Sequence, residues 1–310
     1  MRLKWLGLGI LCAACGGTGT GFDNDGGKTG RDGGGDGNAS LPDGEVTFGD
    51  SGPPTDSGPS DGCSDAAKLV YTIATDNVLR SFNPATLQFK TIGTLNCGTF
   101  ESPNSMAVSR DATAYVNMSD GTLWKVSTTD ASCQPTSYQL DQSNRRIRGM
   151  GFSSDVVQGT AETLYTCTAD DSSGNGGGLA KIALPSFQLT PIGDYSNGLG
   201  GNECELTGTG NAQLFGFFAT LSPPKLAEID KASAATPSPI TLTGVDTTLA
   251  YAFSFWGGDF WFYTQGNGIG STVTHYAYAT TKTFSTAIAD TGFTIVGAGV
   301  STCAPVSPPN

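Results

Sequence analysis

Two glutamates that flank a cysteine, in Glu203-Cys204-Glu205, are the residues of this chain best suited to acid–base chemistry. Alternate residues of a β-strand point to one face, so both carboxylates could reach the same space if this segment leads into a strand. A pair of carboxylates is the machinery of glycoside hydrolysis. The pair allows a polysaccharide hydrolase or lyase, although solvated loop carboxylates explain the same residues.

A second catalytic arrangement would depend on His275, the one histidine of the chain. A Ser-His-Asp triad would have to use it, but it stands between Thr274 and Tyr276 in the middle of an expected outer strand. That position favours a structural histidine. We therefore expect no catalytic residue and no cofactor.

Two oxygen-rich segments are candidates for calcium. The Asp-rich segment 23–32, Asp-Asn-Asp-Gly-Gly-Lys-Thr-Gly-Arg-Asp, superficially resembles a calcium loop, but the closing Glu that a hand-type loop needs at its twelfth position is Gly34. The segment 170–175, Asp-Asp-Ser-Ser-Gly-Asn, could wrap a cation, and a flexible hairpin explains the same letters without metal. Apart from Cys12 and Cys15, which lie in the N-terminal signal, the chain has no Cys-x-x-Cys pair that would support zinc. We expect no metal site.

The chain has eight cysteines, of which two, Cys12 and Cys15, lie near the N-terminus. The even set of six that remains in an exported chain argues for three disulfides. Six cysteines allow fifteen pairings, so the fold must choose among them. A bridge between the two ends of the folded part would staple it, and sequential neighbours are the simplest choice for the rest. The expected pairs are Cys63–Cys303, Cys97–Cys133 and Cys167–Cys204.

The N-terminus has the form of an export signal. A basic segment over residues 1–4 precedes an apolar run over 5–14, which is too short to span a membrane. The stretch Leu11-Cys12-Ala13-Ala14-Cys15 resembles a bacterial lipobox, although Cys12 stands where that motif usually has Leu. The resemblance implies a signal peptide over 1–14, acylation of Cys15 and, with Gly16 next to it, the outer membrane. Simple secretion with cleavage near Ala14 is the alternative.

Residues 15–62 are predicted to be a disordered tether that follows the lipid anchor. From Gly16 to Gly62, 16 of 47 residues are Gly and nine are acidic. Such a segment buries too little apolar surface to offset its chain entropy. The formal net charge of the whole chain is −12, and a nucleic-acid partner would need a basic face. The one basic run, Arg145-Arg146-Ile147-Arg148, is expected to be a solvated loop or to pair with neighbouring acids.

A strand-sized phrase recurs five times after residue 62, at a spacing of roughly 35 to 55 residues. Short β-branched and aromatic runs alternate with Gly, Ser, Thr, Asn and Asp, and no segment shows sustained helical periodicity. Repeated all-strand units of this length suggest the blades of a propeller. The copies are Asn77-Val-Leu-Arg-Ser-Phe82, Gly121-Thr-Leu-Trp-Lys-Val126, Gly178-Leu-Ala-Lys-Ile182, Lys225-Leu-Ala-Glu-Ile-Asp230 and Ser271-Thr-Val-Thr-His-Tyr-Ala-Tyr278.

The sequence thus predicts an all-β fold over residues 63–304, a five-bladed propeller of four-stranded antiparallel blades, with a short tail over 305–310. The first blade lacks an inner strand at its start, and the segment 294–302 can supply it and close the ring. Splitting the long final blade would give six blades instead. The outer strand of the second blade is expected over 136–140, and the inner strands over 294–302, 105–109, 148–153, 205–209 and 250–256.

The most apolar part of the chain is the run Phe253-Ser-Phe255-Trp256 with Phe260-Trp261-Phe262-Tyr263. Blades pack on both faces, so these aromatics are expected to be core. An aromatic platform for stacking on sugars is the functional alternative, and it would need Trp256 or Trp261 to be exposed.

The strand phrases, with Leu206-Thr-Gly-Thr-Gly-Asn211 and Thr294-Ile-Val-Gly-Ala-Gly-Val-Ser-Thr-Cys303, resemble uncharacterised predicted lipoproteins of myxobacterial type, over roughly residues 63–304. More broadly the chain looks like the NHL, kelch-like and quinoprotein-like propellers. These groups share an architecture and no single activity, so the resemblance implies a fold and no site.

Together these observations predict an outer-membrane lipoprotein, facing the periplasm or the cell surface, that acts as a non-enzymatic binding or scaffold module. A protein or glycan partner would contact the rim formed by the loops that enter the inner strands. A surface-coat protein without a specific ligand and the polysaccharide hydrolase or lyase are the alternatives. The rim residues expected to take part are Glu101, Asn104, Arg146, Asp171, Asn202, Glu203 and Glu205.

Overall fold

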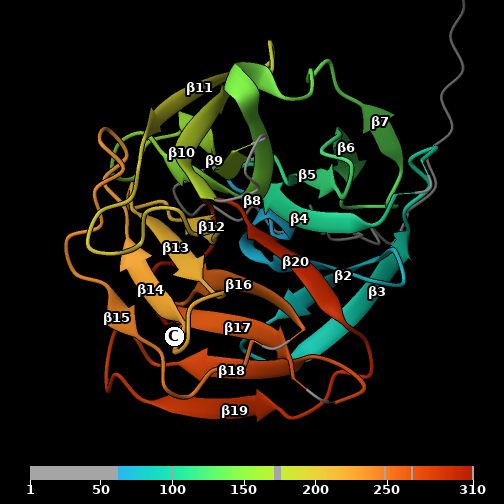
Figure 1. The fold of residues 1–310 in the computed structure, drawn as a ribbon. Coiled ribbons are helices and arrows are strands. Elements are labelled where there is room, and N and C mark those ends of the chain that lie inside the picture. Colours follow the sequence, from blue (N-terminus) through green and yellow to red (C-terminus); the bar gives the residue numbers. More distant parts are fainter. Residues whose placement is uncertain (1–61, 100, 171–175, 248, 267, 309–310) are drawn as a thin grey trace, which may run out of the picture. The chain divides into compact units, whose positions relative to one another are not determined.

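Figure 1 shows a computed structural model, which describes residues 62–99, 101–170, 176–247, 249–266 and 268–308. The expected signal peptide, Cys15, nearly all of the tether and the Asp-rich segment 23–32 lie outside the described residues. The same holds for Asp171 and for most of the second calcium candidate. Within the described ranges, no helix combines the length and apolar character needed to cross a membrane.

The described part is built from strands with two short 3₁₀ helices, Ala66–Lys68 and Gln142–Asn144. Twenty strands form five four-stranded antiparallel sheets, and the innermost strands contact one another in a closed cycle, as Figure 1 shows. The fold is therefore a five-bladed propeller, which confirms the prediction and the count of five. The innermost strands, in order around the ring, are β20 (Ile295–Val300), β4 (Pro103–Val108), β8 (Arg145–Ser154), β12 (Glu205–Gly208) and β16 (Ala250–Trp256).

The other three strands of each blade follow outward in chain order. In the first blade they are β1 (Val70–Ala74), β2 (Val78–Asn83) and β3 (Gln88–Thr94), and in the second β5 (Thr113–Met118), β6 (Leu123–Ser127) and β7 (Cys133–Pro135). In the third blade they are β9 (Glu162–Asp170), β10 (Gly176–Ala183) and β11 (Gln188–Gly193), and in the fourth β13 (Leu214–Phe218), β14 (Lys225–Glu228) and β15 (Ile240–Thr241). In the fifth blade they are β17 (Asp259–Gln265), β18 (Thr272–Tyr276) and β19 (Phe284–Ile288).

The ring is closed by the C-terminal strand, as predicted. β20 pairs antiparallel with β1, with Val300 opposite Val70 and Gly299 opposite Tyr71. Next to this pairing, Ser301 Oγ donates to the carbonyl of Ala67 at 2.6 Å. Because both ends of the folded part share one sheet, the inner edge of β1 is paired by β20 and cannot template aggregation.

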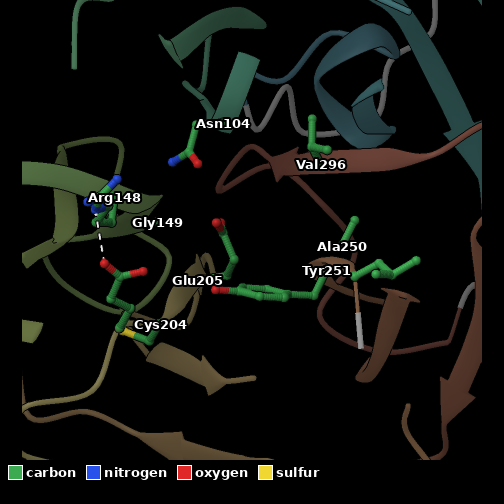
Figure 2. Close-up of a pocket in the computed structure, with 10 residues that line it drawn as sticks. Asn104, Arg148, Gly149, Cys204, Glu205, Ala250, Tyr251 and Val296 are labelled. Carbon is green, nitrogen blue, oxygen red and sulfur yellow. Dashed lines mark ion pairs between the residues drawn. The ribbon is translucent and has the colours of Figure 1, made fainter. Parts of the chain in front are cut away.

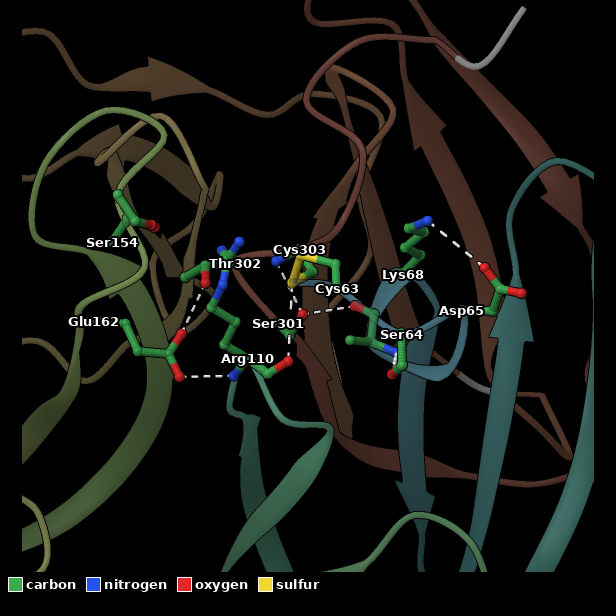
Figure 3. The surroundings of a disulfide bond; sticks show 12 residues. Cys63, Ser64, Asp65, Lys68, Arg110, Ser154, Glu162, Ser301, Thr302 and Cys303 are labelled. Atoms are coloured by element: carbon green, nitrogen blue, oxygen red, sulfur yellow. Dashed lines mark hydrogen bonds and ion pairs between the residues drawn. A yellow bond between two sulfur atoms is a disulfide. The ribbon is translucent and has the colours of Figure 1, made fainter. Parts of the chain in front are cut away.

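A disulfide adds a covalent link where the two ends meet (Figure 3). Cys63 and Cys303 are bonded with their Cα atoms 5.7 Å apart. The other disulfides are Cys97–Cys133 and Cys167–Cys204. These are the three pairs expected from the sequence, and three disulfides are typical of an extracytoplasmic protein.

The recurring phrase lies in the same place in every blade. Its five copies fall on β2, β6, β10, β14 and β18, which are the third strands from the centre. The period of the sequence is therefore the period of the blades. A third strand is paired on both edges, and the apolar side chains on its faces pack against the adjacent blades, as Leu79, Val126, Ile182, Leu226 and Val273 do, while the loops between strands are free to vary.

Close packing of the inner strands depends on glycine. A Cβ on Gly149 would overlap the carbonyl oxygen of Cys204 and the Cα of Glu205, and one on Gly208 would overlap the carbonyl oxygen of Phe152. Glycine is the residue that permits such close approach of two backbones. β8 and β12 can therefore lie against each other only because of these positions.

The aromatic run of the fifth blade is core. Phe253, Phe260 and Phe262 are buried and pack against Phe215 and Phe217 of the fourth blade, with ring centroids of Phe217 and Phe262 4.9 Å apart. Trp256 and Trp261 are 8% and 6% exposed, so neither forms a surface platform. The Nε1 of Trp256 donates to the carbonyl of Lys68 at 2.8 Å, which ties the fifth blade to the start of the first.

One expected strand is wrong. The outer strand of the second blade is β7, over Cys133–Pro135, and not residues 136–140. Thr136 Oγ1 donates to the carbonyl of Leu123, and Tyr138 is buried in the cluster shared with the third blade. The alternation that suggested a strand thus comes from residues that pack between two blades.

Candidate functional site

The starts of the inner strands surround a cavity of about 240 Å³ at one end of the central channel. We call this cavity the channel mouth; Figure 2 shows the side chains that line it. Every blade contributes, because each inner strand begins here. The lining residues are Asn104 on β4, Arg148 and Gly149 on β8, Glu203, Cys204 and Glu205 at β12, Leu249, Ala250 and Tyr251 at β16, and Val296 on β20.

An irregularity in β8 shapes one wall of the mouth. The pairing of β8 with β9 shifts register between Ile147 and Met150, which is the signature of a bulge. Bulges re-aim side chains, and this one places Arg148 on the cavity while Gly149 lies against the backbone of residues 204–205. The local geometry of the wall therefore depends on the Ile147–Met150 segment.

Glu205 is the most buried charged residue of the mouth, at 5% exposure. Ser105 Oγ donates to its Oε2 at 2.7 Å, and the backbone N–H of Met150 donates to Ser105 Oγ at 3.2 Å. Burial raises the pKa of Glu205 to about 8, the Ser105 hydrogen bond opposes the shift, and the charge of Glu203 adds to it. At neutral pH the Glu205 carboxyl is therefore mostly protonated.

Glu203 differs from Glu205 in its environment. It is partly exposed, and its Oε1 lies 3.1 Å from Nε of Arg148. The contact is an ion pair without a hydrogen bond, and Nε of Arg148 has no acceptor among the described residues. The two formal charges of this pair cancel, so with Glu205 protonated the mouth carries no net charge at neutral pH.

Several polar atoms of the mouth have no partner in the part of the chain that the structure describes. Besides Nε of Arg148, they are the side-chain amide of Asn104, the hydroxyl of Tyr251 and Oε1 of Glu205. Figure 2 shows the Asn104 amide and the Glu205 carboxyl directed toward the same central space, with the Tyr251 hydroxyl end beside Glu205. Burial also raises the pKa of Tyr251, so it stays a neutral donor and acceptor. The mouth thus presents a converging set of free donors and acceptors.

Of the rim residues expected from the sequence, the structure brings Asn104, Glu203 and Glu205 into one cavity. Three others serve the surrounding loops instead. Glu101 accepts a hydrogen bond from Ser119 Oγ at 2.7 Å, Arg146 pairs with Asp141 at 3.6 Å, and Asn202 donates to the carbonyls of residues 199 and 200. Asp171 lies outside the described residues.

Arg148 and Tyr251 were not among the expected site residues. Arg148 belongs to the basic run, whose ion-pairing interpretation is correct: Arg146 and Arg148 both contact acids. Both missed residues lie at the start of an expected inner strand, over 148–153 and 250–256. Inner strands start together at one face of a propeller. Aligning the first residues of the five expected inner strands would therefore have brought Arg148 and Tyr251 together with Asn104 and Glu205.

His275 does not belong to the mouth. It lies on β18, two strands outward from the channel, where its Nε2 is 2.8 Å from Asp259 Oδ2 and its ring stacks on Trp261 at 4.4 Å between centroids. This environment supports the structural role expected from the sequence. Within the described ranges, no three or more His, Cys, Asp or Glu side chains are grouped as metal ligands.

A second cavity, of about 430 Å³, lies beside the Cys63–Cys303 bond and the C-terminal segment, with Pro305 and Val306 in its lining. The nearby carboxylate is fully engaged, as Figure 3 shows. Glu162 accepts from the backbone N–H of Arg110 at 2.7 Å and from Thr302 Oγ1 at 2.8 Å. This cavity is larger than the mouth, but the carboxylate beside it is used to join Arg110 to Thr302, so we place the candidate site at the mouth.

Comparisons with known proteins add no family to these observations. No protein-family model and no curated protein matches the chain. Among solved structures, a Bacteroides caccae protein of unknown function is similar at 8% identity, a TM-score of 0.42 and coverage of 74% of this chain and 97% of that one. A structure described as the Dos1 propeller is similar at 12% identity, a TM-score of 0.39 and coverage of 77% of this chain and 71% of that one. Neither similarity bears on function.

Proposed function

We propose that the protein is a non-enzymatic lipoprotein of the cell envelope that presents its propeller as a binding module, with the channel mouth as the contact site. The observation that carries this proposal is the convergence of unpartnered polar atoms from several blades on one cavity. The Asn104, Tyr251 and Glu205 atoms are accessible from the cavity, so a ligand can bond them in place of water. Nε of Arg148 is buried without an acceptor among the described residues, and a buried unpaired donor costs free energy until a ligand or a water supplies a partner.

The envelope location rests on the sequence and on the disulfides. The lipobox-like segment ends at Cys15, and acyl chains on that cysteine would anchor the protein durably to a membrane without spanning it. The Gly- and Asp-rich tether would then hold the propeller clear of the lipid head groups. An outer-membrane position, facing the periplasm or the cell surface, follows from the residue after Cys15.

The test is retention of envelope material on the immobilised full-length mature protein. Solubilised polysaccharide, peptide and lipid fractions would be passed over the wild type and over the double variant Asn104→Ala/Tyr251→Phe. Saturable retention that the double variant loses supports the proposal. Retention that both proteins share equally, or broad adhesion that never saturates, contradicts it and favours a coat protein.

One observation favours the second candidate, a polysaccharide hydrolase or lyase. The mouth holds two carboxyl groups in different environments, a buried one that is protonated at neutral pH and one that is paired with Arg148. In glycosidases, environments that give two carboxyl groups different pKa values make one of them the acid and the other the base. Breakdown of envelope glycans that disappears in both Glu203→Gln and Glu205→Gln would establish this activity in place of binding alone.

A further inference from the structure

The chemistry of the mouth specifies more than the existence of a ligand. We propose that the channel mouth binds one neutral, hydroxyl-rich ring, such as a monosaccharide or the terminal sugar of a glycan, through Asn104, Glu205 and Tyr251. This inference rests on the proposed binding function and names its ligand class. It is argued from the hydrogen-bonding groups, the charge and the size of the cavity.

The direction of the hydrogen bond at Glu205 fixes which oxygen faces the ligand. Ser105 Oγ accepts the N–H of Met150, so its own proton is directed to Oε2 of Glu205. The proton of the neutral carboxyl is then left to Oε1, which forms no hydrogen bond with a described residue. Glu205 therefore offers an O–H donor to the cavity, beside a hydroxyl from Tyr251 and an amide from Asn104.

These groups match hydroxyls better than any single ionic group. An amide and a phenol each donate and accept, and the protonated carboxyl donates. A hydroxyl also both donates and accepts, so several hydroxyls on one ring can satisfy the whole set. A site built to hydrogen-bond hydroxyls rejects analogues that lack them, because its own polar groups are then left unpaired.

The charge balance disfavours ionic ligands. The charge of Arg148 is already neutralised by Glu203, whose Oε1 lies 3.1 Å from its Nε, so an anion would meet the Glu203 carboxylate without an uncompensated positive charge to attract it. A cation would meet Arg148 and a protonated Glu205. The titratable and charged groups that face Glu205 from the packed strands are Glu203, Arg148 and Tyr251. Only a neutral ligand leaves this arrangement undisturbed.

The size and the apolar part of the lining agree with a single ring. Pockets for drug-sized ligands usually measure about 300–1,000 Å³, and the mouth measures about 240 Å³. Val296, Ala250 and Leu249 supply apolar surface, and Leu249 is 64% exposed at the edge. Such surface can cover the C–H groups of a sugar ring while its hydroxyls reach the polar side.

The test is calorimetric titration of the full-length mature protein with the methyl glycosides of glucose and galactose and with N-acetylglucosamine. Glucosamine, glucuronate and diglycine serve as charged probes of similar size. The variants are Asn104→Ala, Tyr251→Phe and Glu205→Gln, and the matched control is Tyr278→Phe, which removes a hydroxyl on the same blade that makes no hydrogen bond to a described residue.

We expect saturable binding of a neutral sugar that weakens about three- to tenfold in Tyr251→Phe and in Asn104→Ala. The control should bind as the wild type does. Glu205→Gln, which keeps a neutral donor, should retain binding above pH 8, where the wild type loses it as Glu205 ionises. This pH difference separates a contact with the ligand from a purely structural role.

Other outcomes overturn the inference and separate it from the proposed function. Tighter binding of a charged probe, or binding of neutral sugars that the variants leave unchanged, rejects the ligand class. If no probe binds while Asn104→Ala/Tyr251→Phe still abolishes retention of an envelope fraction, the ligand class is wrong and the binding function stands. If no probe binds and the double variant retains the envelope fraction as the wild type does, the ligand class and the binding function are both wrong.

Discussion

Ser105 and Glu205 lie 100 positions apart in the sequence and meet inside the channel, where Ser105 Oγ donates to Glu205 Oε2 at 2.7 Å. They belong to inner strands of the second and fourth blades, and the third blade joins in through the N–H of Met150. Three blades are thus linked by one buried hydroxyl. The same hydroxyl orients the carboxyl that faces the channel mouth.

The first prediction concerns this hydroxyl. Ser105→Ala removes the donor to Glu205 and the acceptor for Met150, which leaves two buried groups unpaired. We expect a loss of about 1–3 kcal/mol in the free energy of unfolding, measured by urea denaturation. Ser119→Ala is the control, because Ser119 bonds Glu101 at the exposed surface. Equal losses in both variants would mean that the buried link is worth no more than a surface contact.

The second prediction is a pH dependence of stability. The pKa of Glu205 is raised from 4.5 to about 8 in the folded protein, so between these values the folded state binds more protons than the unfolded chain. Its contribution is fully present below pH 4.5 and is lost as the pH rises through 8. We expect the stability of the wild type to fall by a few kcal/mol relative to Glu205→Gln over this window.

This comparison isolates Glu205 from other groups. The pKa of Glu162 is also raised by burial, and it shifts stability in the same direction in both proteins. The difference between wild type and Glu205→Gln in urea midpoints at about pH 5, 7 and 9 removes that background. A constant difference across the three pH values would show that the carboxyl does not titrate as described.

The third prediction tests the close approach of β8 and β12. In Gly149→Ala the new methyl group would overlap the backbone of residues 204 and 205. Overpacking of this kind costs about 1–3 kcal/mol or more, and here it also moves a wall of the mouth. Gly268→Ala is the control, since its methyl group would meet only the carbonyl oxygen of Gly270 at 3.7 Å. Similar thermal midpoints for the two variants would refute the tight contact.

The fourth prediction ranks the disulfides. Cys63–Cys303 closes a span of 240 residues and Cys97–Cys133 one of 36. In the chain-entropy model the first bond contributes about 5.5 kcal/mol and the second about 4 kcal/mol. Paired Cys→Ala variants of each bond, unfolded in urea, should follow this order. A smaller loss for the 63–303 variant would mean that the β1–β20 pairing alone secures the closure.

Much of the fold could be predicted because the sequence repeats it. The phrase that recurs in each blade lies on the third strand, where apolar residues are needed on both faces, and the missing inner strand of the first blade pointed to the segment 294–302. The outer strand over 136–140 was predicted wrongly because residues that pack between blades alternate as strand residues do. The outer strand of the second blade has only three residues and that of the fourth blade only two, so the local pattern defines them poorly.

The site could be predicted only in part. Glu203 and Glu205 stood out by their spacing, and Asn104 by its place before an inner strand. Arg148 and Tyr251 reach the mouth through a bulge in β8 and through the start of β16, and neither feature is marked by residue type. The protonation of Glu205 depends on burial by other blades, which only the closed ring supplies.

The most direct test of the account is the position of a bound sugar. Crystals of the full-length mature protein would be grown with the neutral monosaccharide that binds most tightly in the titrations. The account predicts one ring in the channel mouth, with hydroxyls within hydrogen-bond distance of Asn104, Tyr251 and Oε1 of Glu205. A ring bound on an outer strand, or beside the Cys63–Cys303 bond, would contradict the assignment of the mouth as the binding site.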